Sequence, residues 1–201
     1  IESLDGAFRT AGDVGTTGRD LETMSETCSW VHRQEASLAR SVARGVSAAI
    51  TGALSALGEA PMEGQTASVQ GAGSIGTEVV RRLSGQGVRV TVADLDSSRS
   101  SAIADQTGSA VCAPEELWDL DADLTIPCAL GGVIDEPFAL QSRTTLICGG
   151  ANNILSAPEV ERLLMDRGVA FVPDFISSAG GVIDGIGETV MGLSDRGPLI
   201  D

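Results

Sequence analysis

Three glycines at a fixed spacing are the residues of this sequence with the clearest chemical use. They lie in a G-x-G-x-x-G turn that contains Gly71, Gly73, Ser74, Ile75 and Gly76. In such a turn the first glycine permits a sharp bend, the second lets a ligand approach the backbone, and the third lets a helix pack closely on a strand. The N–H groups that open the following helix can bind phosphate. The pattern therefore predicts a phosphate-binding turn, with a tight turn that binds nothing as the alternative.

An acidic residue stands at the end of the next apolar run. Asp94 follows Gly76 by 18 residues, and Leu95 comes directly after it. An acid at this place accepts hydrogen bonds from ribose hydroxyls and repels a phosphate on the 2′ position. The combination predicts a dinucleotide site that prefers NAD to NADP. Arg99 leaves NADP open as the alternative, because a nearby guanidinium could hold the 2′-phosphate.

Alternating patterns along the chain predict the elements that position this turn. Apolar residues recur at helical spacing over 35–57, and short apolar runs then alternate with amphipathic stretches. Strands are expected over 67–70, 88–93, 110–111, 123–126, 145–148 and 169–172, and helices over 18–26, 35–57, 75–83, 97–106 and 158–167. This order is typical of a doubly wound, Rossmann-type α/β domain, with a mostly parallel sheet and helices on both faces. We expect an interdomain segment over 1–34 and the Rossmann domain over 35–201.

Three further loops follow predicted strands, over 127–132, 149–153 and 173–175. Ligands of such sheets bind outside the carboxyl ends of the strands, so these loops are expected beside the glycine turn. Asn152 offers an amide suited to a carboxamide or a carboxylate. An Asx-turn is an equally good reading of that asparagine.

The composition argues against several kinds of partner. The net charge of −15 argues against nucleic acid, whose phosphates need clustered basic side chains. All 13 basic residues are arginines. No apolar run approaches the length of a membrane span, so we expect a cytoplasmic protein that binds no membrane. The four cysteines, Cys28, Cys112, Cys128 and Cys148, lack metal-site spacing, so we expect reduced thiols and no metal. The chain has no lysine and no tyrosine, so a mechanism that needs either must obtain it elsewhere.

Five segments, in this order, resemble the leucine/phenylalanine/valine branch of the amino-acid dehydrogenases. They are D-V-G-T-T (13–17), V-Q-G-A-G-S-I-G (69–76), P-C-A-L-G (127–131), G-A-N-N (150–153), and V-P-D-F with A-G-G-V-I (172–175 and 179–183). The resemblance implies reversible, NAD-dependent oxidative deamination of an L-amino acid to a 2-oxo acid and ammonia. It also implies a separate first domain that carries catalytic lysines and builds the oligomer.

The resemblance further implies roles for single residues. Asp13 would be the catalytic acid or base, Asp94 would hold the ribose, and Asn152 would lie at the nicotinamide and the substrate carboxylate. The remaining implied positions are Cys128, Ala129, Leu130 and Ala151 along the cofactor, and Ala11, Val182 and Gly185 around the substrate side chain. From the residues alone, Asp13 could instead cap the helix that follows it.

The sequence also departs from the family pattern. The lysine-bearing domain is absent, a glycine-rich loop is missing between Val31 and Ala36, Leu38 replaces a threonine, and Ser178 replaces the asparagine of N-A-G-G. Three functions therefore stay open. The first is the nucleotide-binding part of an NAD-dependent amino-acid dehydrogenase, whose small-molecule partner is an amino acid or a 2-oxo acid and which is completed in a homo-oligomer or by a partner chain. The second is a short relative that has lost catalysis and acts as a dinucleotide-binding or scaffold protein. The third is an imine-reducing enzyme completed by a partner.

Overall fold

The computed structural model describes residues 1–13, 15–33 and 35–201. Val14 of the D-V-G-T-T segment and Gln34, where the expected interdomain segment ends, lie outside the described residues. The chain forms two compact units, Ile1–Leu38 and Ala39–Asp201.

The first unit contains a short 3-10 helix, η1 (Glu2–Leu4), and the helix α1 (Gly18–Ser25). A capping box begins α1, because the Thr17 hydroxyl accepts from the Asp20 N–H and the Asp20 carboxylate accepts from the Thr17 N–H. Trp30 contacts the segment that follows η1. The Arg9 guanidinium lies 4.7 Å from the centre of its ring, and a Cβ on Gly6 would come within 2.7 Å of the same ring.

The second unit is built on a six-stranded parallel sheet with the order β3-β2-β1-β4-β5-β6. The strands are β1 (Thr66–Gln70), β2 (Arg89–Ala93), β3 (Ala110–Val111), β4 (Leu124–Pro127), β5 (Leu146–Ile147) and β6 (Ala170–Phe171). All five strand pairs are parallel, and β1 lies between β2 and β4. The predicted doubly wound Rossmann-type sheet is therefore confirmed. The chain reverses its direction of growth between β1 and β4, and this is the switch point where such folds bind ligands.

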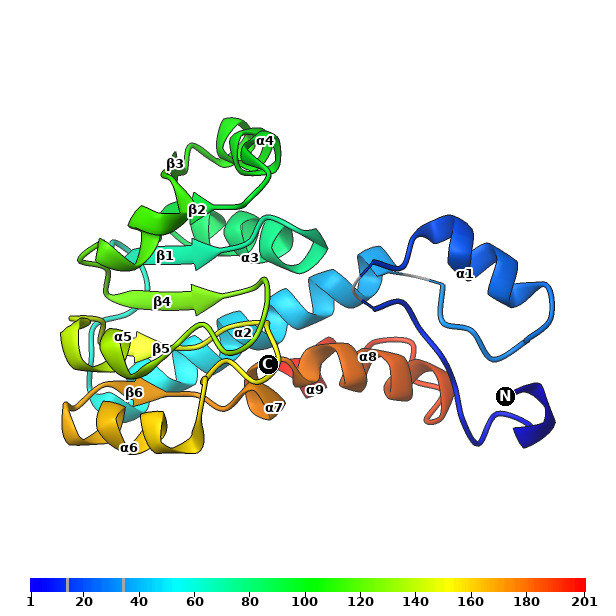
Figure 1. Ribbon diagram of the computed structural model, residues 1–201. Coiled ribbons are helices and arrows are strands. Elements are labelled where there is room, and N and C mark those ends of the chain that lie inside the picture. Colours follow the sequence, from blue (N-terminus) through cyan, green and yellow to red (C-terminus); the bar gives the residue numbers. More distant parts are fainter. Residues whose placement is uncertain (14, 34) are drawn as a thin grey trace. The chain divides into compact units, whose positions relative to one another are not determined.

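Helices cover both faces of the sheet (Figure 1). The helices are α2 (Glu35–Leu57), α3 (Ser74–Gly85), α4 (Ser97–Thr107), α5 (Glu136–Gln141), α6 (Pro158–Asp166), α7 (Asp174–Ser177), α8 (Ala179–Thr189) and α9 (Gly197–Ile200), with the 3-10 helix η2 (Pro114–Asp119). The larger core cluster joins α2, α3 and α4 to one face, and the smaller joins α5 and α6 to the other. Leu146 belongs to the first cluster and Ile147 to the second, as expected for neighbours on a strand that is buried on both sides.

The long helix α2 packs along the first of these faces with a stripe of apolar residues. Val42, Val46, Ile50 and Leu54 are all buried, as their spacing predicts. Leu57 is 48% exposed because the helix ends there, before Gly58 turns the chain at φ 72°. Among the described residues, no helix combines the length and the apolar character that crossing a membrane requires.

Candidate functional site

The glycine turn joins β1 to α3 at the centre of the sheet. Gly71 has φ 95°, a left-handed conformation that favours glycine, and its N–H donates to the carbonyl oxygen of Ala93 at 2.7 Å. A Cβ on Gly71 would also lie 2.8 Å from the Cβ of Ala129, in the loop after β4. Glycine is therefore required here for two reasons, the backbone conformation and the closeness of the neighbouring loop.

The other two glycines of the turn differ in their surroundings. A Cβ on Gly76 would lie 1.9 Å from the carbonyl oxygen of Gly71, so the start of α3 packs directly on the turn. A Cβ on Gly73 would meet no atom within 4 Å, so the surface above Gly73 is open. Gly73 is the N-cap of α3, and no side chain of the described residues caps that helix. The first N–H groups of α3 thus face a place that an anion can enter.

Asp94 ties the glycine turn to the end of β2. One carboxylate oxygen accepts a hydrogen bond from the Ala72 N–H at 2.7 Å, and the other accepts from the Asp96 N–H at 2.8 Å. The side chain is half-buried, so further lone pairs stay accessible from the open side. Beside it, Leu95 is 93% exposed. The sequence predicted the position of this acid but did not reveal its two backbone partners.

The loop after β4 carries three of the implied cofactor residues. The Cys128 N–H donates to the carbonyl oxygen of Gln70 at 2.7 Å, which fixes this loop against the glycine turn. Cys128 is buried, whereas Ala129 and Leu130 are exposed at the carboxyl edge of the sheet. The three residues therefore do not present similar surfaces, since only Ala129 and Leu130 are open to a ligand.

The loop after β5 packs against the same edge. A Cβ on Gly149 would lie 2.1 Å from the Pro127 carbonyl oxygen, and one on Gly150 would lie 2.7 Å from the Ile75 side chain. Ala151 is buried and its N–H donates to Pro127, so it supports the loop rather than facing solvent. The close approach of three loops explains why glycines follow successive strands.

Asn152 lies exposed at the tip of that loop. Within the described part of the chain its amide makes no hydrogen bond, so the alternative of an Asx-turn at Asn152 is wrong and the amide is available to a ligand. Its neighbour Asn153 has φ 51°, and the N–H of Asn153 donates to the Asp174 carboxylate at 2.6 Å. Sequence reasoning named the 173–175 loop but missed this role of Asp174. The feature of the sequence that could have indicated this role is that Asp174 is an acid just after the strand predicted over 169–172, at the same edge of the sheet as Asn152.

A buried hydroxyl below this loop was also missed. Ser177 is fully buried, and its hydroxyl donates to the carbonyl oxygen of Gly149 at 2.6 Å. It connects α7 to the loop after β5. No spacing in the sequence indicates a contact across 28 residues.

Two thiols lie beneath the site. Cys128 and Cys148 are 9% and 1% exposed, and all four cysteines are free. Burial raises the pKa of the Cys128 thiol to about 12, and burial also raises the pKa of Cys148. Both therefore stay protonated near neutral pH and serve as small apolar side chains of the core.

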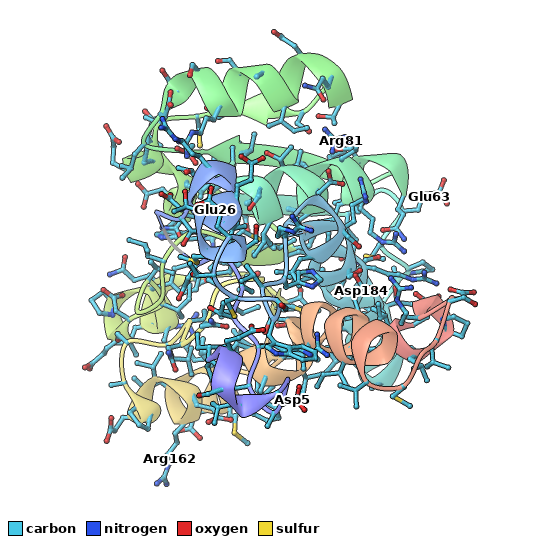
Figure 2. The ribbon with its side chains drawn as sticks, turned by 90° about the vertical axis from the view of Figure 1, so that its right-hand side faces the viewer. Asp5, Glu26, Glu63, Arg81, Arg162 and Asp184 are labelled. Carbon is cyan, nitrogen blue, oxygen red and sulfur yellow. The ribbon has the colours of Figure 1, made fainter. Side chains whose placement is uncertain are left out.

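The helix α8 carries two positions implied for the substrate pocket. Val182 is 63% exposed and Gly185 is half-buried. The opposite side of α8 is packed, since a Cβ on Gly180 would lie 2.0 Å from the Ser41 carbonyl oxygen of α2. Asp184, labelled in Figure 2, is buried and accepts from the Arg196 guanidinium at 2.8 Å. The helix is thus held from one side while Val182 faces solvent.

Ala11 and Asp13 belong to the first unit, whereas the other implied site residues belong to the second. The Asp13 N–H donates to the Thr16 hydroxyl at 3.1 Å, and its carbonyl oxygen accepts from the Thr16 N–H. The cap of α1 is Thr17. The alternative reading of Asp13 as the helix cap is therefore wrong.

The sheet order, the glycine turn at the switch point and the acid after β2 together define a Rossmann-type α/β domain. A family model described as Glutamate/Leucine/Phenylalanine/Valine dehydrogenase matches residues 92–194, about half of the chain. The chain belongs to this family of amino-acid dehydrogenases.

Similar proteins agree with this assignment. The chain is 29% identical to a leucine dehydrogenase of Thermoactinomyces intermedius over 96% of its own length and 55% of that protein. It is 32% identical to a valine dehydrogenase of Streptomyces coelicolor over 91% of its length and 53% of that protein. The crystal structure of L-tryptophan dehydrogenase from Nostoc punctiforme superposes with a TM-score of 0.81 at 28% identity, covering 99% of this chain and 59% of that one. The chain thus spans about half the length of the relatives it matches.

Proposed function

We propose that this chain binds NAD at the carboxyl edge of its sheet, as the nucleotide-binding part of an NAD-dependent amino-acid dehydrogenase. The observation that carries the proposal is the uncapped start of α3 above the open Gly73, with the Asp94 carboxylate fixed beside it. The N–H groups of α3 and its positive dipole end would hold the pyrophosphate. The accessible lone pairs of Asp94 would accept from the ribose hydroxyls, and Leu95 would offer apolar surface to the adenine. The exposed Leu130, in the loop after β4, would line the cofactor.

The nicotinamide end would lie across the loops after β4 and β5. Asn152 is free to hydrogen-bond the carboxamide or the substrate carboxylate, and Asn153 and Asp174 fix the loop that presents it. When bound, the nicotinamide supplies the acceptor for a hydride from the α-carbon. Val182 and Gly185 would line the substrate side chain. For Asp13 the resemblance implies transfer of the proton between the amine and water.

The absence of lysine limits what these residues can do by themselves. Oxidative deamination develops negative charge on oxygen, which a nearby cation stabilises. All cations of this chain apart from His32 and the amino terminus are arginines, and the family resemblance places lysines in another domain. We therefore expect the 201 residues to bind NADH without converting an amino acid, and a lysine-bearing domain or partner chain to complete the reaction.

The binding half of this proposal is tested by NADH fluorescence. We expect the wild-type chain to bind NADH, and Asp94→Ala to bind it about 10-fold or more weakly, because a hydrogen-bonded charged group contributes about 1.5–3 kcal/mol. Asp105→Ala is the matched control, since this acid lies exposed on α4. Failure of the wild-type chain to bind NADH would contradict the proposal.

A further inference from the structure

The connection between β2 and α4 contains a second acid whose role is unassigned. The N–H of Asp96 donates to the Asp94 carboxylate at 2.8 Å, so its backbone is fixed directly beside the group proposed to hold the ribose. A substituent on the ribose 2′ position would therefore meet the start of α4. The chemistry of that short segment decides which substituent fits.

The carboxylate of Asp96 is surrounded by donors of three kinds. One oxygen accepts from the Ser98 N–H at 3.1 Å and from the Ser98 hydroxyl at 2.5 Å. The other lies 3.4 Å from the Arg99 Nε. Helix N–H groups, a hydroxyl and a guanidinium are also the donors that proteins use to bind phosphate.

These contacts keep Asp96 charged. The hydrogen bond from the Ser98 hydroxyl, followed by that from the Ser98 N–H and the charge of Arg99, lowers the pKa of Asp96 below its ordinary value. The Asp96 carboxylate is therefore negatively charged near neutral pH, and the donors around it, from Ser98 and Arg99, already interact with it.

We propose that Asp96 is the residue that makes the site select a 2′-hydroxyl over a 2′-phosphate. This inference rests on the proposed NAD site and adds to it. Asp94 repels a 2′-phosphate but leaves Arg99 as a group that could attract one. Asp96 opposes the binding of a 2′-phosphate by Arg99. Its carboxylate is paired with Arg99, accepts hydrogen bonds from Ser98, and adds a second negative charge where the phosphate would lie.

The two components of this effect differ in strength. The side chains of Asp96 and Arg99 are 50% and 60% exposed, so their ion pair is weak by itself. Repulsion between the Asp96 carboxylate and a doubly charged phosphate acts in the same direction and is screened by salt. We therefore expect a change of several-fold in selectivity, and a larger change at low ionic strength.

The test compares NADH and NADPH affinity in the full chain by fluorescence titration. We expect wild type to prefer NADH, and Asp96→Asn to raise NADPH affinity about 5–10-fold while NADH affinity stays within about 2-fold. Arg99→Gln should cancel most of this gain in the Asp96→Asn background and should change little with Asp96 present. Asp105→Asn, on the same helix, is the control and should leave the ratio unchanged.

Two outcomes would overturn the assignment while NADH still binds. One is an unchanged NADH to NADPH ratio in Asp96→Asn. The other is an equal loss of NADPH affinity from Arg99→Gln with and without Asp96, which would show that Arg99 is already available. If Asp96→Asn unfolds α4, Arg99→Gln in the otherwise wild-type chain still tests the proposal, because with Asp96 present it should change NADPH affinity little, and a clear loss of NADPH affinity would overturn the assignment. Absence of NADH binding by wild type would instead defeat the proposed function, and this assignment with it.

Discussion

Because Gly76 has no side chain, the helix α3 can pack closely on the turn that follows β1. An added Cβ would lie 1.9 Å from the Gly71 carbonyl oxygen, which is backbone and cannot rotate away. We predict that Gly76→Ala lowers the free energy of unfolding by about 1–3 kcal/mol, as overpacking of a tight site does, and weakens NADH binding. Urea denaturation and the NADH titration measure the two effects.

The same helix provides the control. Gly85 is exposed near the end of α3, and a Cβ there would meet nothing within 4 Å. Gly85→Ala should therefore be neutral or stabilise by up to about 1 kcal/mol, since alanine favours the helix. Equal stability of Gly76→Ala and Gly85→Ala would contradict the packing described for the turn.

At this scale the sequence predicted where the glycines and Asp94 lie, because their spacing follows the strands and helices around them. It could not predict what Asp94 contacts within the protein, nor that Asp174 and Ser177 hold the loop after β5. The contacts of Asp94 with Ala72, of Asp174 with Asn153 and of Ser177 with Gly149 each span 21 to 28 residues, and no periodic pattern links these partners. The roles of Asp13, Asn152 and the other implied site residues stay predictions until binding and turnover are measured.

Among the elements, β1 and β4 are joined at their amino ends by a carboxylate. One oxygen of Asp123 accepts from both the N–H and the hydroxyl of Thr66, each at 2.7 Å. These hydrogen bonds, that from the N–H first, lower the pKa of Asp123 below 3.8. Because the folded pKa is depressed, the contribution to stability is present above pH 3.8 and disappears as pH falls through the folded pKa.

We predict that Asp123→Asn lowers the free energy of unfolding by about 1 kcal/mol near neutral pH, a value kept small because the side chain is exposed. The difference from wild type should shrink as pH falls from 3.8 through the folded pKa of Asp123, because below that pKa both proteins carry a neutral side chain. Asp121→Asn is the control, since its ion pair with Arg143 is 3.4 Å long and solvent-exposed. A difference that is constant down to the lowest pH would show that charge plays no part.

The longer helices that were predicted repeat apolar residues at helical spacing, and the longer strands are short apolar runs between turns. Helices α2, α3, α4 and α6 and strands β1, β2 and β4 lie within a few residues of their predicted bounds. The helices α5, α7, α8 and α9 were missed. In α5, six residues with a proline in the first turn give no period to read. Strands β5 and β6 are only two residues long, because pairing ends where the loops turn toward the carboxyl edge.

Across the whole second unit, the sheet order brings three distant loops to one edge. The loops after β1, β4 and β5 meet within van der Waals contact at glycines, although they begin at residues 71, 128 and 148. The sequence indicated this meeting through the general rule for parallel sheets. It did not indicate how tightly the loops after β1, β4 and β5 pack against one another.

The buried thiols below these loops make the opening of the site measurable by chemical modification. The thiolate is the form that attacks an alkylating reagent, so Cys128 and Cys148 should react only in molecules whose carboxyl edge has transiently opened, whereas Cys28 of the first unit is more accessible. Mass spectrometry of alkylated peptides would then follow the opening of this edge in time. NADH should slow the alkylation of Cys128 and leave that of Cys28 unchanged; equal protection of both cysteines would mean that the nucleotide acts on the reagent or the whole chain rather than on this edge.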